Sequence, residues 1–159
     1  MIEELSKRIG SERVVTRLTE RLAYAHVASF YRLVPQAIVR PATLEHVQDI
    51  LAWCSRTGTS CTFRTGGTSI SGQAVTDGII VDLARDWSDV SIASDGSTVT
   101  MQPGITGARV NAMLQKYARK LGPDPASLIA AMIGGIVANN SSGMCCGTAQ
   151  NSYHTLDGM

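Results

Sequence analysis

Apolar residues recur at helical spacing over residues 1–22, with a break at Gly10-Ser11. The apolar positions that share these faces are Ile2, Leu5, Ile9, Val14, Leu18 and Leu22. The pattern predicts a helical start in two pieces. Residues 23–36 show no clear periodicity and end near Pro35, so we expect a segment that covers the unit following it.

Short apolar runs and one amphipathic helix alternate in the next part of the chain. Residues 37–40, 60–64 and 78–83 read as strands, and a helix capped by Thr43 and ended by Gly58 joins the first two. The apolar face of this helix carries Leu44, Val47, Ile50, Leu51 and Cys54. A helical crossover between strands implies parallel pairing. The pattern therefore predicts a β-α-β unit, with a further strand after a glycine-rich loop.

Two more strands and a helix follow. Residues 90–93 and 98–102 have the short apolar runs of strands, and Thr106 is placed to cap a helix that Gly122-Pro123 would end. The apolar face of this helix carries Val110, Met113, Leu114, Tyr117 and Leu121. Beyond it the chain is loop-rich, with one short segment of small residues at 132–138. Strands and helices of this kind predict an α+β fold.

Composition and charge narrow the class of protein. The chain has 159 residues, of which 44% are hydrophobic and 17% charged, so it has enough apolar material for a packed core. Its net charge is +1, without the basic excess of a nucleic-acid binder. No apolar run approaches the roughly 18 residues that span a bilayer, and no secretory h-region opens the chain. We expect a cytoplasmic protein.

Cysteine and histidine spacing argues against a metal site. The four cysteines include no CxxC pair, and the three histidines are far apart in the sequence. We expect reduced thiols, with the adjacent Cys145-Cys146 buried rather than redox-active. For Tyr153-His154, near the end of the chain, we expect a packing or surface role.

Two segments combine glycine with small hydroxyl and amide residues, namely residues 64–73 and 133–143. Without a Cβ, a loop of this kind can bring backbone N–H groups close to a bound oxyanion. Hydroxyl groups of Thr68, Ser69 and Ser142 would add donors. Such loops hold a pyrophosphate without a large positive charge, in agreement with the nearly neutral chain.

Two common phosphate motifs do not fit the first segment. The spacing from Gly67 to Gly72 matches a P-loop, but Gln73 and Ala74 stand where lysine and a hydroxyl residue are required. The dinucleotide fingerprint fails because Gly66-Gly67 has the wrong spacing and a strand follows. Tight turns without a ligand, and a non-catalytic module for another nucleotide or phosphate, remain alternatives. For Arg64, pairing with an anion and a structural role at the strand end both remain open.

The order of these motifs resembles the FAD-binding domain of the vanillyl-alcohol oxidase and p-cresol methylhydroxylase (PCMH) superfamily. Within it, the chain is most similar to FAD-linked 2-hydroxy-acid dehydrogenases, the group of D-lactate dehydrogenase, the glycolate oxidase flavin subunit and D-2-hydroxyglutarate dehydrogenase. The likeness runs from about Val34 to the last residue. It is carried by Pro35-Gln36-Ala37-Ile38-Val39-Arg40-Pro41, Arg64-Thr65-Gly66-Gly67-Thr68-Ser69, Gly72-Gln73, residues 99–104, Gly122-Pro123-Asp124-Pro125-Ala126-Ser127 and residues 133–143.

The resemblance implies a set of cofactor contacts. In the family the first glycine loop wraps the FAD pyrophosphate, and the later stretches contact the pyrophosphate, the ribityl chain and the flavin edge. The first set maps to Thr65, Gly66, Gly67, Thr68, Ser69, Gly72 and Gln73. The second maps to Pro123, Asp124, Ser127, Gly134, Gly135, Asn140, Ser142 and Gly143. Covalent members often carry a histidine where this chain has Thr68, so the resemblance implies non-covalent FAD.

The resemblance also implies a domain plan and an activity. We expect a covering segment at 1–36, a first FAD-binding subdomain at 37–104, and an incomplete second subdomain at 105–159. The parent protein would oxidise a small D-lactate-like 2-hydroxy acid by hydride transfer to FAD. Its catalytic residues would lie outside this chain, which we expect to be inactive alone. We further expect a soluble or membrane-peripheral parent, and self-association through an uncovered sheet edge.

Overall fold

The computed structural model describes residues 2–159, and the chain divides between Asp86 and Trp87 into two compact units. This division differs from the boundary expected between residues 104 and 105. The reason is that strands β5 (Val90–Ile92) and β6 (Val99–Met101) pair with each other and pack into the core of the second unit. They do not extend the sheet of the first unit.

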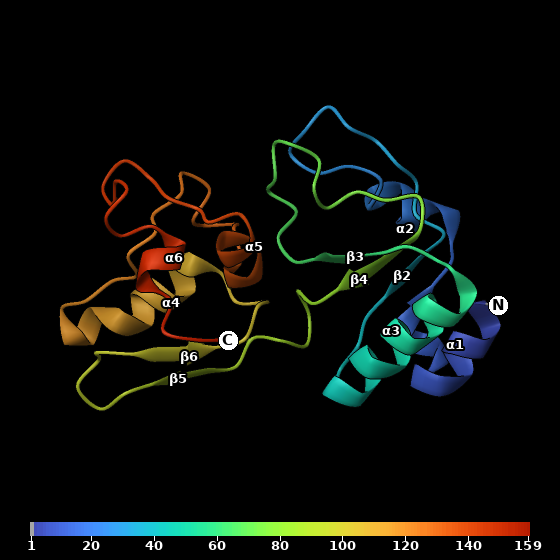
Figure 1. Cartoon of the computed structure of the whole chain (residues 1–159), viewed down its shortest axis with the longest axis horizontal. Coiled ribbons are helices and arrows are strands. Elements are labelled where there is room, and N and C mark those ends of the chain that lie inside the picture. Colours follow the sequence, from blue (N-terminus) through green and yellow to red (C-terminus); the bar gives the residue numbers. More distant parts are fainter. Residues whose placement is uncertain (1) are drawn as a thin grey trace. The chain divides into compact units, whose positions relative to one another are not determined.

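The first unit is built on a four-stranded sheet in the order β1-β2-β4-β3 (Figure 1). Its strands are β1 (Val14–Val15), β2 (Ala37–Val39), β3 (Cys61–Arg64) and β4 (Ile79–Asp82). Both β2 and β3 run parallel to β4, which lies between them. The predicted parallel β-α-β unit is therefore confirmed. All of the residues in β2 and β4 are buried, as expected for strands covered on both faces.

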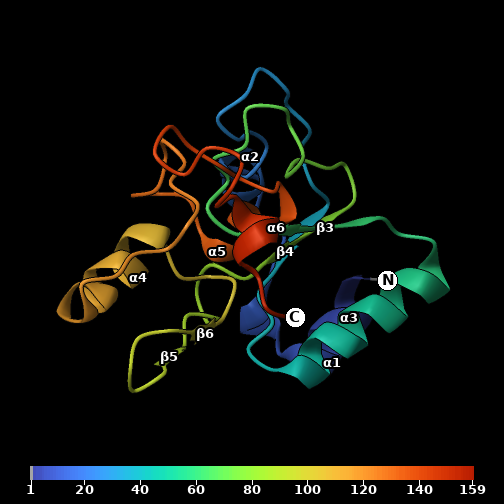
Figure 2. The same cartoon turned by 60° about the vertical axis from the view of Figure 1, so that its left-hand side comes forward.

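Two helices cover one face of this sheet. Helices α1 (Ile2–Ile9) and α3 (Leu44–Thr57) lie side by side in both views (Figure 1, Figure 2). The core beneath them joins helix and strand residues, with Leu5, Ile9, Val14, Ala37, Val39, Ile50, Trp53, Cys54, Ile79 and Val81 packed together. The strands thus hold a rigid frame from which the loops at their ends project.

Helix α3 begins and ends where the sequence predicts. The Thr43 side chain accepts a hydrogen bond from the His46 amide at 3.3 Å, and Gly58 ends the helix in the left-handed conformation. The predicted apolar face is partly wrong, because Leu44 and Leu51 are exposed. Trp53 takes the buried position instead, since its larger ring fills the space between helix and sheet.

The first 22 residues are less helical than predicted. After α1 come a 3₁₀ turn at Ser11–Arg13, strand β1, and the short helix α2 (Leu18–Ala23). The two β-branched valines of β1 pair antiparallel with β2, where an edge of the sheet is open to them. Leu18 and Leu22 are exposed, so the expected continuous face is absent from α2.

The second unit combines a hairpin with short helices. Strands β5 and β6 lie within the two predicted runs and pair antiparallel, and α4 (Gly107–Leu114) follows with a 3₁₀ turn at Gln115–Tyr117. The chain then forms α5 (Ile133–Ala138) and α6 (Ser152–Thr155). The buried core of this unit contains Ile105, Val110, Leu114, Ala131, Ile133 and Ile136.

Helix α4 has the predicted start but ends early. Thr106 caps it by accepting from the Arg109 amide at 3.3 Å. Its helical turns end at Ala118, in the left-handed region with φ 52°, and do not continue to Gly122-Pro123. Among residues 2–159, no helix is long and apolar enough to cross a membrane, and no group of three or more possible metal ligands occurs.

Candidate functional site

The first glycine-rich loop joins β3 to β4 and runs beside the loop that follows α2 (Figure 1). Two of its glycines have backbone angles that favour this residue, with φ 62° at Gly67 and 77° at Gly72. The Gly67 carbonyl accepts a hydrogen bond from the Ala28 amide at 3.2 Å. The loop is therefore shaped both by its glycines and by a segment about forty positions earlier in the chain.

The amide groups of this loop are available to a ligand. Within residues 2–159, no acceptor takes a hydrogen bond from the amides of Gly66, Gly67, Thr68 or Ser69. Each of these residues is only partly buried. A run of amides that face no protein acceptor is the donor set that an oxyanion requires. The residues present therefore fit a bound pyrophosphate.

A polar cluster lies next to this loop in the same unit. Arg64 donates to the Tyr24 carbonyl at 2.9 Å, and its guanidinium lies 5.0 Å from the centre of the Tyr24 ring. The Tyr24 hydroxyl donates in turn to Asp82 at 2.6 Å, and Arg40 lies 3.4 Å from the same carboxylate oxygen. Sequence reasoning left the role of Arg64 open and missed Tyr24 and Asp82, which carry no local motif.

Burial controls the protonation of this cluster. Burial, followed by the hydrogen bond to Asp82, raises the pKa of the Tyr24 phenol, so the phenol keeps its proton at neutral pH. Burial lowers the pKa of the Arg64 guanidinium, which nevertheless stays charged because a guanidinium is not deprotonated in proteins. The cluster thus contributes a fixed positive charge close to the first loop.

The end of the first loop is closed by its own side chains. The Ser69 hydroxyl donates to the Gln73 side-chain oxygen and accepts from the Ser71 amide at 3.2 Å. The Cα of Gly72 lies against Tyr31, where an added Cβ would come within 2.6 Å of the ring. The predicted first set, from Thr65 to Gln73, therefore lies in one loop, and the Ser69–Gln73 hydrogen bond closes its later half.

The second glycine-rich region is organised around a carboxylate. Asp124 accepts hydrogen bonds from the amides of Cys145 and Cys146 at 3.1 and 3.2 Å. Gly143 packs so closely on Asp124 that a Cβ would lie 2.0 Å from its carbonyl oxygen. Residues 124 and 143, both predicted as cofactor contacts, are thus in contact. The Asp124 carboxylate already accepts two backbone amides of the second region and holds that part of the region in shape.

Hydrogen bonding shifts the ionisation of this pair. The Cys145 side chain, together with the amides of Cys145 and Cys146, holds the pKa of the Asp124 carboxyl below its ordinary value. The same carboxylate raises the pKa of the Cys145 thiol. Cys146 is buried as expected, but Cys145 is exposed, which corrects the expectation that both are buried. An exposed thiol held protonated is a poor nucleophile.

Asn140 occupies a strained turn after α5. Its φ is 46°, and its side-chain oxygen accepts from the Tyr153 amide at 3.0 Å. The Ser152 hydroxyl donates to the carbonyls of Ile136 and Ser141. The acceptor of the Asn140 amide is thus used inside the loop, which leaves its N–H groups as the donors for a ligand.

The remaining predicted residues lie in the same unit. Ser127 begins a turn, and its carbonyl accepts hydrogen bonds from the amides of Ala130 and Ala131. The Gly134 amide donates to the Pro103 carbonyl at 2.9 Å. Pro123 is buried, whereas Ser142 is exposed. Gly135 accepts from the Asn139 amide at the end of α5. The second set is therefore gathered around α5 and the loop after it.

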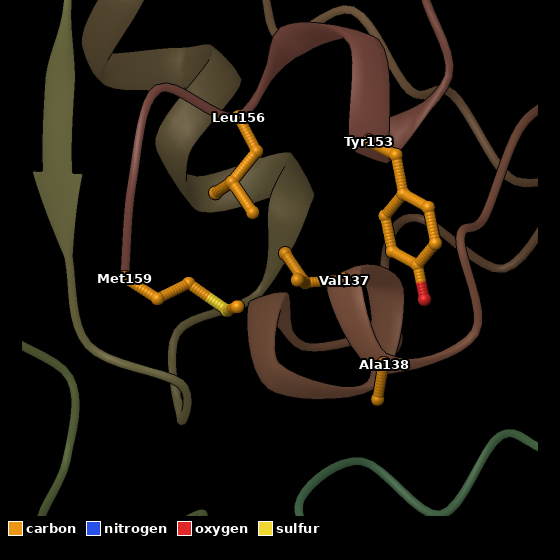
Figure 3. A pocket seen from close by; sticks show the side chains of 5 residues that line it. All are labelled: Val137, Ala138, Tyr153, Leu156 and Met159. Atoms are coloured by element: carbon orange, nitrogen blue, oxygen red, sulfur yellow. The ribbon is translucent and has the colours of Figure 1, made fainter.

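An apolar pocket of about 390 Å³ lies beside this loop (Figure 3). It is lined by Val137, Ala138, Tyr153, Leu156 and Met159. Tyr153, for which the sequence indicated packing or surface, is half exposed and lines the pocket with its ring. The neighbouring His154 is tied to the Thr148 carbonyl by its ring nitrogen at 2.8 Å.

Residues 35–159 match a known family described as FAD binding domain. The chain is 34% identical over 130 residues to the glycolate oxidase subunit GlcD of Escherichia coli, covering 80% of this chain and 26% of that protein. It is 27% identical over 146 residues to the D-2-hydroxyglutarate dehydrogenase of the same organism, covering 89% of this chain and 14% of the relative. The chain therefore spans about a quarter or less of these relatives.

Solved structures show the same fold at low sequence identity. An alkyldihydroxyacetonephosphate synthase matches 94% of this chain and 30% of its own with a TM-score of 0.80 and 22% identity. A p-cresol methylhydroxylase with substrate bound matches 74% of this chain and 24% of its own, with a TM-score of 0.60 and 15% identity. The expected α+β, PCMH-type fold is confirmed. With its sequence matched over residues 35–159, the chain belongs to the FAD binding domain family.

Proposed function

We propose that this chain binds FAD non-covalently, as the cofactor-binding part of a dehydrogenase or oxidase that acts on a 2-hydroxy acid. The observation that carries the proposal is the row of unpartnered amides from Gly66 to Ser69, next to the charged Arg64. Backbone amides and one nearby cation match the two negative charges of a pyrophosphate. The family match supports FAD over another phosphate ligand.

Each loop has a distinct part in this proposal. The first loop would hold the pyrophosphate through the amides of residues 66–69 and the hydroxyls of Thr68 and Ser69. The second region would contribute the N–H groups of Asn140 and the backbone around Gly134 and Gly135. Asp124 would support the site indirectly, by fixing the turn at Cys145 and Cys146, because its carboxylate already accepts the amides of these two residues.

When bound, FAD supplies the acceptor for a hydride leaving the α-carbon of a 2-hydroxy acid. The group that removes the hydroxyl proton would lie outside these 159 residues, so we expect the isolated chain to be inactive. The substrate class is supported by relatives whose names specify glycolate, D-2-hydroxyglutarate and D-lactate. A cytoplasmic or membrane-peripheral location and self-association complete the proposal.

A visible absorption spectrum of the purified chain tests FAD binding. We expect flavin bands, either as purified or after reconstitution with FAD, and complete release of the flavin into the supernatant on acid precipitation. Flavin retained in the pellet would contradict non-covalent binding. A colourless protein that cannot be reconstituted would contradict FAD binding, and displacement of FAD by ADP alone at equal concentration would favour a general nucleotide module.

The same preparation tests the assignment of activity. Anaerobic addition of D-lactate or D-2-hydroxyglutarate is expected to leave the flavin spectrum oxidised, whereas dithionite bleaches it. Bleaching by either hydroxy acid would show that the chain contains the groups that take the proton.

A further inference from the structure

The segment from Tyr24 to Val34 lies before the part of the chain that matches the family, which begins at residue 35. Three contacts nevertheless join it to the first glycine loop. The Tyr24 carbonyl accepts from Arg64, the Ala28 amide donates to Gly67, and the Tyr31 ring packs on Gly72. The two segments lie side by side in both views (Figure 1, Figure 2).

Arg64 is the link through which this segment acts on the loop. Its guanidinium rests on the Tyr24 ring and passes under Gly67, where a Cβ would lie 2.6 Å from Nη2 and 2.8 Å from Nε. Gly67, with a φ of 62°, therefore lies directly against the guanidinium, in a place that a side chain would fill. A shift of the guanidinium would change the packing beneath this part of the loop.

Tyr24 is in turn held by the sheet of the first unit. Its hydroxyl donates to Asp82 at 2.6 Å, and Asp82 is buried at the end of β4 with a second hydrogen bond from the Ala84 amide at 3.0 Å. The chain of contacts thus runs from the rigid sheet through Asp82, Tyr24 and Arg64 to Gly67. Each member has a defined partner, as preorganised binding loops require.

We propose that Tyr24 is a positioning residue for the cofactor, which holds Arg64 and through it the amides of residues 66–69 in the geometry that receives a pyrophosphate. The proposal rests on the proposed function, because it assumes that these amides bind FAD. It extends the site to a residue that lies before the matched part of the chain.

Hydrogen exchange of the cofactor-free protein tests the first half of the proposal. In Tyr24→Leu, which removes the ring and hydroxyl, we expect faster exchange in the peptide that covers residues 64–73 and unchanged exchange in the peptides of α3 and β4. Tyr24→Phe keeps the ring beneath Arg64 but loses the hydrogen bond to Asp82, so we expect its exchange in the 64–73 peptide to lie between those of Tyr24→Leu and wild type. Equal exchange in Tyr24→Leu and wild type would overturn the proposal.

FAD titration, followed by quenching of flavin fluorescence, tests the second half. We expect the Kd of Tyr24→Leu and Arg64→Met to rise about tenfold, with a smaller rise in Tyr24→Phe, which loses only the hydrogen bond to Asp82. The matched control is Tyr117→Leu, which removes a tyrosine that packs on Gly96 and Lys116 and belongs to the second unit. It should lower the melting temperature without changing the Kd.

The outcomes separate the two proposals. Wild-type protein that fails to bind FAD would contradict the proposed function itself. Wild type that binds FAD, with Tyr24→Leu and Arg64→Met binding equally well, would overturn only the role of Tyr24. A Kd raised as much by Tyr117→Leu as by Tyr24→Leu would show a general loss of stability and would also overturn it.

Discussion

Each of the two glycine-rich regions of this chain is supported by a charged side chain, and the two charges have opposite signs. The first loop is supported by the cation Arg64, which is held by Tyr24 from a distant segment. The second is supported by the anion Asp124, which accepts hydrogen bonds from the amides of Cys145 and Cys146 later in the chain. A cation beside the loop favours a bound phosphate, whereas a carboxylate would repel it.

The two regions are therefore suited to different parts of a ligand. Within residues 2–159 the amides of residues 66–69 have no protein acceptor, which under the proposed function suits the first loop to the charged part of the cofactor. The second uses its carboxylate internally and offers the Asn140 amide, which is suited to a neutral, hydrogen-bonding ligand group. Four substitutions test this contrast between the two regions.

The largest effect is expected at the contact between Gly143 and Asp124. Gly143→Val would force its side chain into the Asp124 backbone, where even a Cβ lies at 2.0 Å, and overpacking of this kind costs about 3 kcal/mol. We expect a lower unfolding free energy by urea titration and faster exchange in residues 141–147. Gly158→Val is the control, since nothing lies within 4 Å of its Cβ position. Equal stability of both variants would contradict the close packing.

A second substitution removes the support of the first loop. Asp82→Ala leaves the Tyr24 hydroxyl and Arg40 without their buried acceptor, which costs about 3 kcal/mol. The matched control is Asp95→Ala, because Asp95 is exposed and accepts hydrogen bonds from Ser97. We expect this control to lower the unfolding free energy by about 0.5 kcal/mol. Urea unfolding measures both, and similar costs would show that the buried cluster contributes nothing beyond a surface turn.

A third substitution separates backbone strain from the role of the loop. Gly67→Ala and Gly58→Ala each place alanine at a positive φ, of 62° and 68°, with a cost of about 1 kcal/mol. The Cβ of residue 58 meets nothing, but that of residue 67 displaces Arg64. We therefore expect weaker FAD binding in Gly67→Ala alone. Equal Kd values in the fluorescence titration would count against the first loop as the pyrophosphate site.

The smallest effect is expected from the charge of Asp124. Because its carboxyl pKa is lowered in the folded protein, its contribution is present above the ordinary carboxyl pKa and is lost as pH falls through the folded value. Asp124→Asn should lower stability near neutral pH and flatten the decline in urea midpoint below about pH 4. The exposed Cys145 thiol should then react faster with iodoacetamide, since its pKa is no longer raised by the carboxylate. An unchanged acid limb would contradict this coupling.

Local sequence predicted the elements of the fold well where one residue decides them. Thr43, Gly58 and Thr106 cap or end their helices as expected, because a cap depends on contacts within one turn. The errors arose where a partner distant in sequence decides the outcome. Val14 and Val15 formed a strand because β2 offered an open edge, and Trp53 replaced Leu51 in the core because it fits against the sheet.

The same distinction applies to the site. Both loops are visible in the sequence because they are rich in glycine and small polar residues. The order of these loops carries the resemblance, which agrees with the family match. Tyr24 and Asp82 have no such signature. Their importance comes from contacts with residues about forty and sixty positions away, which only the folded chain reveals.

The helix caps, the strands other than β1, the glycine loops and the cofactor family can therefore be read from the sequence, since each depends on local geometry or on motif order. The charge that supports each loop is visible only in the folded chain. The Arg64 guanidinium lies against Gly67 and is held there by contacts with Tyr24, whereas the Asp124 carboxylate accepts hydrogen bonds from two amides that are distant in sequence and close only in the fold.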